Sequence, residues 1–267
     1  MNFCRLLISR LRLFFNCIKS NYLICKYRLF IGPNHESIKN TGHVLIVKKL
    51  IYVDVSIHSI LSFLFYNKNS RIIIHCDKLC FEKICETFSQ QINIGRVEVK
   101  IDMEDSAWQL SKLRLFKSLP DESHCMFDVD ARWNGKLVLE TGVSYVSHNE
   151  FTFVEKSPWR WLIECYLNLD NSKNLLMLNT SFIRRSNFLS TDYFMLDDVF
   201  ERLHNILDCK EVGYEDHFGI VRIAEQVAIA IYLQCSGEKV KAIVHDGRPR
   251  SGLLFETTYF GATGNTF

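Results

Sequence analysis

Hydrophobic and polar positions follow two different periods along the middle of this chain. The apolar runs with the length and β-branched content of strands are 43–49, 50–55, 71–76, 97–101 and 124–128. The segments with apolar residues three and four positions apart, as in amphipathic helices, are 56–66, 79–90 and 107–118. Strands that alternate with helices are typical of right-handed crossovers. The pattern therefore predicts an α/β fold with a doubly wound, mostly parallel central sheet.

The first thirty residues follow another pattern, in which apolar side chains alternate with basic ones. Residues 1–30 contain six basic residues and no acidic one, and Gly32-Pro33-Asn34 ends the segment. We expect a basic amphipathic helix within 1–34, followed by a polar connection over 35–42. Arg10 and Arg12 interrupt the apolar run well short of the roughly 20 residues of a membrane span, and no signal-peptide pattern is present. The helix either lies on an anionic membrane surface or packs on the domain with its basic face in water.

Composition narrows the class of protein. The chain has 267 residues, 48% of them hydrophobic, and a formal net charge of +2, which fits a globular protein and excludes nucleic acid as an expected partner. Ten cysteines are scattered through apolar segments without a CxxC pair or a zinc-binding spacing. Reduced thiols in a cytoplasmic protein agree best with this distribution.

Two carboxylates follow the last predicted strand. Asp128 and Asp130 are separated by one residue, and alternate residues of an ideal strand share a face, so both carboxylates could bind one cation. Mg²⁺ or Mn²⁺ held by one or two carboxylates keeps coordination positions open for phosphate oxygens. The alternative is an Asp pair that only begins a turn.

Asp77 follows another predicted strand, so Asp77 and Asp128 should both lie at the carboxyl edge of the sheet, where such folds bind ligands. Neither GxxxxGK[ST] nor GxGxxG occurs anywhere in the chain. A phosphate-bearing ligand would therefore depend on metal and side chains.

Several motifs in the same order resemble the nucleotide-sugar-dependent glycosyltransferases of the A-type fold. They are Ile72–Asp77, Leu110–Arg114, Phe127–Asp130, Met177–Phe182, Ala224–Ala228 and Val244–Arg248. The resemblance implies a Rossmann-like nucleotide-diphospho-sugar transferase domain over 43–267. Its nucleotide-binding half would be 43–135 and its acceptor half 136–267.

The resemblance also implies roles for individual residues. Asp130 and His245 would bind the divalent metal, and Asp128 would contact the ribose or reach the metal through water. The donor-binding residues would include Asp77 and Arg248, together with Lys112 or Arg114, which lie two apart on a helix and so face different directions.

On the acceptor side, Asn179 and Glu225 are the candidates, with Glu225 acting as the catalytic base of an inverting enzyme or as a residue that orients the acceptor. A negative charge in the first turn of a helix also explains Glu225 without catalysis.

The expected function is the metal-dependent transfer of a sugar from a nucleotide-diphosphate sugar to a carbohydrate or lipid-linked acceptor, as in surface polysaccharide or glycolipid synthesis. The enzyme would be cytoplasmic, and peripheral on the cytosolic membrane face if the N-terminal helix binds lipid. A nucleotidyltransferase is the first alternative, but it needs a glycine-rich loop after the first strand, and the expected loop, Val53–His58, has no glycine. A catalytically silent binding module of the same fold is the second.

Overall fold

A computed structural model of the 267-residue chain describes its first half almost continuously and parts of its second half. The described residues are 18–33, 37–103, 108–133, 135–150, 177–186, 225–230, 232–233, 239–243 and 259–260. The candidate residues His245 and Arg248 lie outside these ranges.

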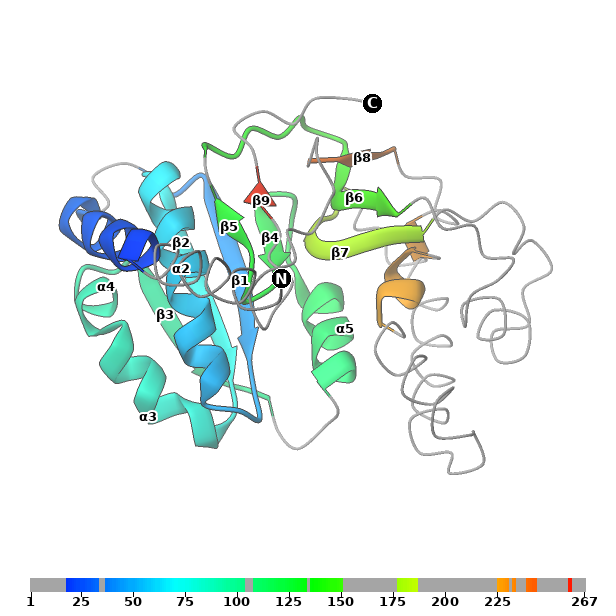
Figure 1. Cartoon of the computed structure of the whole chain (residues 1–267). Coiled ribbons are helices and arrows are strands. Elements are labelled where there is room, and N and C mark those ends of the chain that lie inside the picture. The colour runs from blue at the N-terminus through cyan, green and yellow to red at the C-terminus, as the bar shows by residue number, and fades with distance from the viewer. Residues whose placement is uncertain are drawn as a thin grey trace, which may run out of the picture.

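A seven-stranded sheet organises the described residues, in the order β3-β2-β1-β4-β7-β6-β8 (Figure 1). Its strands are β1 (Asn40–Ile46), β2 (Ser70–Cys76), β3 (Val97–Ile101), β4 (His124–Phe127), β6 (Ser144–Glu150), β7 (Met177–Arg184) and β8 (Val240–Ala242). β3, β2, β1 and β4 are parallel, β7 is antiparallel to both β4 and β6, and β6 is parallel to β8. A short parallel pair is formed by β5 (Arg132–Trp133) and β9 (Tyr259–Phe260).

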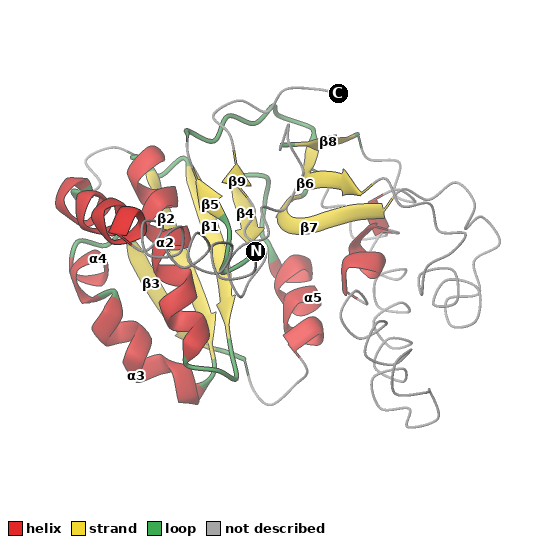
Figure 2. Ribbon diagram, viewed as in Figure 1, coloured by secondary structure: helices red, strands yellow, loops and turns green. Residues whose placement is uncertain are grey.

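Helices connect the parallel strands, as Figure 2 shows. They are α2 (Ile51–Tyr66), α3 (Lys78–Thr87), α4 (Ser89–Asn93) and α5 (Trp108–Ser118). The chain moves from β1 through β2 to β3 in one direction and then returns past β1 to β4. Because such crossovers are right-handed, the return places α5 on the opposite face of the sheet from α2. The strand order reverses between β1 and β4, the point at which α/β sheets open a crevice for ligands. The predicted fold class, a mixed and mostly parallel α/β sheet, is confirmed.

The prediction of a strand over 50–55 is wrong. β1 ends at Ile46, Lys48 adopts a left-handed backbone conformation with a φ of 68°, and α2 begins at Ile51. The β-branched residues of this run suggested a strand, but its buried positions continue into the next segment at helical spacing. They include Val53, Ser56, Ile60 and Leu64. Burial against the sheet outweighs the weak strand preference of the first turn. β1 also begins at Asn40, inside the segment expected to be a polar connection.

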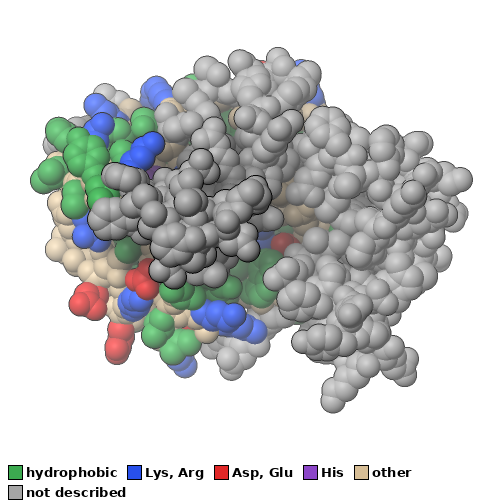
Figure 3. All heavy atoms as spheres, in the orientation of Figure 1, with side chains coloured by type: hydrophobic (Ala, Val, Ile, Leu, Met, Phe, Trp, Pro, Cys, Tyr) green, Lys and Arg blue, Asp and Glu red, His purple; other side chains and the backbone are tan. Residues whose placement is uncertain are grey.

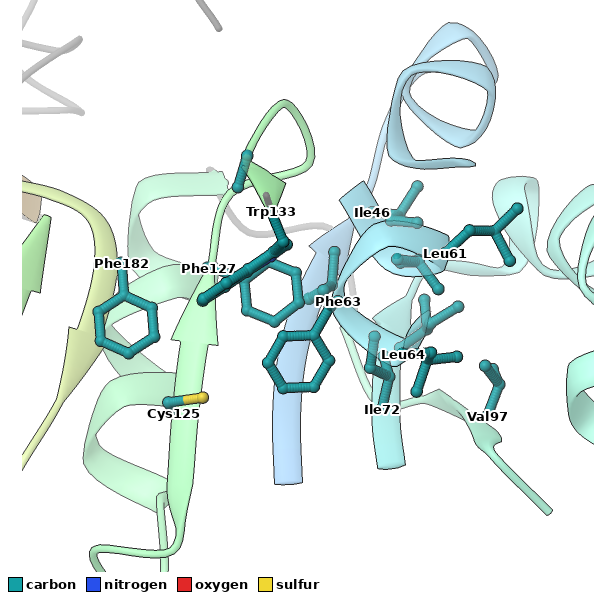
Figure 4. Close-up of a cluster of buried hydrophobic side chains, with 14 of the residues drawn as sticks. Ile46, Leu61, Phe63, Leu64, Ile72, Val97, Cys125, Phe127, Trp133 and Phe182 are labelled. Carbon is teal, nitrogen blue, oxygen red and sulfur yellow. The ribbon is translucent and has the colours of Figure 1, made fainter. Parts of the chain in front are cut away.

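The core between the sheet and α2 is aromatic near β4 (Figure 4). The Trp133 ring meets Phe63, Phe127 and Phe182 edge-on, with ring centroids 5.0–5.7 Å apart. A Cβ on Gly42 of β1 would lie 2.7 Å from Phe127, so this position requires glycine to admit the ring. This core fixes the end of β4, where the Asp doublet follows.

The residues 18–30 form a helix that packs across α2, shown in dark blue in Figure 1. Tyr27 is buried and contacts the rings of His58, Phe65 and Tyr66 on α2. Within the described residues, no helix is both long enough and apolar enough to cross a bilayer.

Three histidines form a hydrogen-bonded row across the sheet, on the side away from α2. His43 of β1 lies between His75 of β2 and His124 of β4, with ring nitrogens 2.9 and 2.7 Å apart, respectively. The second ring nitrogen of His75 is 2.7 Å from the Asp102 carboxylate, just after β3. Burial, with smaller effects from charged neighbours, lowers the pKa of all three histidines, so the rings are neutral at pH 7.

Candidate functional site

The segment after β4 is held in place by hydrogen bonds to β7 and α2 and by one within its own turn. The Asp128 amide donates to the Ser181 carbonyl of β7 at 2.9 Å. The Asp128 carbonyl accepts from the Ser59 hydroxyl of α2 at 3.2 Å and from the Ala131 amide at 3.1 Å. The backbone of Asp128 is therefore fixed at the end of β4, beside the point where the strand order reverses.

The expectation that Asp128 and Asp130 alternate along a strand is wrong. β4 ends at Phe127, and the bond from the Ala131 amide to the Asp128 carbonyl closes a turn around the doublet. The two carboxylates nevertheless act on a common neighbour, because Asp128 forms an ion pair with Lys112 and the charge of Asp130 contributes to the pKa of Lys112. Both Asp side chains are partly exposed.

Lys112 of α5 is the centre of this cluster, and only 5% of the residue is exposed. Its ammonium nitrogen lies 2.8 Å from Asp128 Oδ1, 3.3 Å from Thr180 Oγ1 and 3.8 Å from Glu225 Oε1. Burial works against the charge, but Asp128 and Glu225 outweigh it, so the pKa of Lys112 is raised and the side chain is an ammonium ion. We define Lys112, Asp128, Asp130, Thr180 and Glu225 as the Lys112 cluster.

Glu225 is the first described residue of a helical segment, residues 225–230, and is 3% exposed. Its Oε2 atom is buried without a hydrogen-bond partner among the described residues. Burial raises the pKa of Glu225 to about 7, although the nearby Lys112 ammonium acts in the opposite direction. A carboxyl group with a pKa near neutrality can accept a proton at physiological pH.

The structure separates Lys112 from Arg114, as their spacing predicts. Lys112 is buried in the cluster, whereas Arg114 is exposed on the same helix. The two side chains cannot serve the same ligand group from these positions.

Asp77 lies at the carboxyl end of β2, and its carboxylate caps a helix. Oδ1 accepts from the Cys80 amide at 2.9 Å, at the start of α3, and Oδ2 accepts from the Lys48 amide at 2.5 Å. β1 separates β2 from β4, so Asp77 is two strand spacings, roughly 10 Å, from Asp128 along the sheet edge. A donor molecule would have to span this distance to contact both residues.

Asn179 lies on β7 beside the cluster. Its amide oxygen accepts from the Ser181 amide at 2.9 Å, while the next residue, Thr180, contacts Lys112. Sequence reasoning missed Thr180, because a threonine in an apolar strand carries no chemical signal of its own. A hollow of 490 Å³ lies elsewhere, between the helix of residues 18–30 and α3–α4.

The Lys112 cluster contains more carboxylates than ammonium groups, which favours the binding of a further cation. Three carboxylates, those of Asp128, Asp130 and Glu225, act on one ammonium group. Two Asp oxygens together with substrate phosphates are a sufficient ligand set for Mg²⁺ or Mn²⁺. No group of three or more His, Cys, Asp or Glu side chains with metal-binding geometry occurs among the described residues. A metal at the doublet would have to be completed by substrate or by a ligand outside those residues, such as His245.

No known protein family profile and no curated protein matches this chain. Among solved structures, it is similar to 4-diphosphocytidyl-2C-methyl-D-erythritol synthase from Anaerococcus prevotii DSM 20548, with 13% identity over 77% of this chain and 86% of that one and a TM-score of 0.38. The PaToxG glycosyltransferase matches with 11% identity over 86% of this chain and 81% of that one and a TM-score of 0.40. The mannosyltransferase PcManGT from Pyrobaculum calidifontis, solved with GDP-Man and Mn²⁺, matches with 8% identity over 87% of both chains and a TM-score of 0.32. All three TM-scores are below 0.5.

Proposed function

We propose that this chain is a metal-dependent glycosyltransferase that moves a sugar from a nucleoside-diphosphate sugar to an acceptor hydroxyl. The observation that carries the proposal is the Lys112 cluster, in which the charges of Asp128, Asp130 and Glu225 act on one buried ammonium group. The cluster follows β4, where the strand order reverses. This is the edge at which α/β sheets bind nucleotides.

Asp128 and Asp130 would hold the divalent metal, with His245 as the third protein ligand. When bound, the metal stabilises the negative charge that develops on the departing diphosphate. Lys112 fixes the Asp128 carboxylate at 2.8 Å and adds a positive charge at the same place. Among the predicted donor-binding residues, Lys112 contacts Asp128 of the doublet. Asp77 and Arg248 would contact other parts of the donor.

Glu225 would act on the acceptor. Its pKa of about 7 suits a general base that takes the proton of the attacking hydroxyl, and its buried Oε2 is without a hydrogen-bond partner among the described residues. Asn179, on the neighbouring strand β7, would orient the acceptor. The acceptor that we propose is a carbohydrate or a lipid-linked sugar at a membrane surface.

The turn after β1 argues against nucleotidyl transfer. With α2 starting at Ile51, this turn is residues 47–50 rather than Val53–His58, and it also contains no glycine. The Lys48 amide donates to Asp77, and the Lys49 amide donates to the Val47 carbonyl at 2.9 Å. Backbone amides that are already hydrogen-bonded cannot cradle a triphosphate.

The test is a panel of nucleoside-diphosphate sugars incubated with the full chain and Mn²⁺ or Mg²⁺. We expect release of free nucleoside diphosphate from at least one donor, its loss on chelation with EDTA, and its recovery when Mn²⁺ is added back. Pyrophosphate release from a nucleoside triphosphate and a sugar phosphate would identify a nucleotidyltransferase instead. Absence of both activities would favour the second alternative, a catalytically silent binding module of the same fold.

A further inference from the structure

The helix of residues 18–30 has apolar side chains on two opposite sides. On its inner side, Tyr27 is buried against α2, and Leu23 and Ile24 pack against the core. On its outer side, Ile18, Tyr22 and Leu29 are 50%, 68% and 80% exposed. A helix that only packs on a domain normally has a polar outer side.

The outer residues form a continuous stripe. Ile18, Tyr22, Cys25 and Leu29 are spaced by four, three and four positions, which places them on one face at about 3.6 residues per turn. Tyr27 lies on the opposite face, so the stripe points away from the domain. Figure 3 shows hydrophobic side chains together with Lys and Arg at the upper left, over this helix.

Basic side chains border the stripe on both sides. By helical position, Lys19 and Lys26 lie along one border and Arg28 along the other. The Lys26 ammonium also lies 5.5 Å from the centre of the Phe65 ring, at the junction between the helix and α2. Residues 1–30 contain no acidic side chain that would neutralise these charges within the segment.

We infer that this helix docks the protein on an anionic membrane surface. The outer stripe would enter the boundary between headgroups and acyl chains, while the bordering Lys and Arg side chains reach the anionic headgroups. A lipid surface fits both features at once, because it offers an apolar layer directly below a negatively charged one. The inference is independent of sugar transfer, since none of these residues belongs to the Lys112 cluster.

The test is co-sedimentation of the full chain with vesicles of phosphatidylcholine alone or mixed with phosphatidylserine. The stripe variant Tyr22→Gln/Leu29→Gln should bind the mixed vesicles roughly tenfold more weakly than the natural sequence, because two exposed apolar side chains are lost. The matched control is Leu79→Gln/Val138→Gln, which changes two side chains that are each 59% exposed elsewhere. The control should bind as the natural sequence does.

The basic residues are tested separately. Lys19→Gln should reduce binding to the mixed vesicles roughly fivefold, the equivalent of about 1 kcal/mol, and should have little effect on phosphatidylcholine vesicles. Lys78→Gln, at an exposed lysine of α3, is the control. All these substitutions are at exposed positions, so unchanged melting temperatures and unchanged donor turnover in solution would show that the fold and the Lys112 cluster are intact.

Two results would overturn the inference. One is equal binding of the natural sequence and the stripe variant to the mixed vesicles, or no binding by either. The other is a dimer, seen by sedimentation velocity without lipid, that the stripe variant abolishes, because the stripe would then be a protein interface. Loss of vesicle binding with normal donor turnover would leave the proposed transferase activity untouched.

Discussion

Replacing Glu225 with glutamine should stabilise the protein at alkaline pH while removing its activity. The pKa of Glu225 is about 7 in the folded protein, against an ordinary value of 4.5. Because the folded value is the higher one, folding favours the protonated carboxyl group of Glu225. This contribution to the free energy of unfolding is fully present below pH 4.5 and is lost as the pH rises through 7. Above that pH, the buried charge costs about 3 kcal/mol relative to the neutral carboxyl group.

Glu225→Gln keeps the shape of the side chain and removes this cost. The amide leaves a buried polar atom without a partner, a penalty of about 1 kcal/mol, so the net gain at pH 8 should be about 2 kcal/mol. For a chain of this size the melting temperature should rise by roughly 4–8 °C. At pH 5 the carboxyl group of the folded protein is already mostly neutral, and the variant should gain little.

Circular dichroism melts at pH 8 and pH 5 measure both quantities. Glu82→Gln, at an exposed glutamate of α3, is the control and should melt like the natural sequence at both pH values. Release of nucleoside diphosphate by the Glu225 variant should fall to background. The prediction would be refuted if the Glu225→Gln protein melted at a lower temperature at pH 8, or if its melting temperature shifted equally at both pH values. Either result would show that ionised Glu225 does not destabilise the folded protein.

Three further predictions concern the doublet, a buried histidine and a glycine. Asp130→Asn should abolish nucleoside diphosphate release and change the melting temperature by only a few degrees, because this partly exposed charge serves the ligand. A large destabilisation would indicate a structural role. Burial lowers the pKa of His58 to about 4, below its ordinary value of 6.5, so the folded protein loses stability as the pH falls from 7 to 5, by about 2 kcal/mol from this residue. His58→Phe should remove that share of the loss in urea unfolding, and identical losses in both proteins would contradict it. Gly42→Ala should destabilise by about 1–3 kcal/mol in the same assay, because its Cβ would lie 2.7 Å from Phe127 and 3.2 Å from Phe63; unchanged stability would mean that the rings can move aside.

Local sequence patterns predicted most of the parallel part of the sheet. The runs at 71–76, 97–101 and 124–128 correspond to β2, β3 and β4, and the helix expected over 107–118 corresponds to α5. These segments are short, strongly periodic and bounded by polar residues, so their own composition determines their structure. The run at 50–55 failed because its first turn favours a strand locally, while the buried face that makes it a helix extends to Leu64.

The site was only partly accessible from the sequence. The sequence identified the doublet, Lys112 and Glu225 as candidates, but their association depends on α5, β4, β7 and the segment at 225–230 coming together in three dimensions. Periodicity describes one element at a time and contains no information about such contacts. It therefore could not show that the ammonium of Lys112 lies between two of the predicted carboxylates, or that Thr180 joins them.

The histidine row across β2, β1 and β4 has one consequence for the placement of protons. An ionised Asp102 can only accept, so His75 must carry its hydrogen on Nδ1 and leave Nε2 as an acceptor. His43 then donates from Nδ1 to His75, and His124 donates from Nδ1 to His43. One carboxylate at the end of the row thus selects the same tautomer in all three imidazoles, and their dipoles align across three strands.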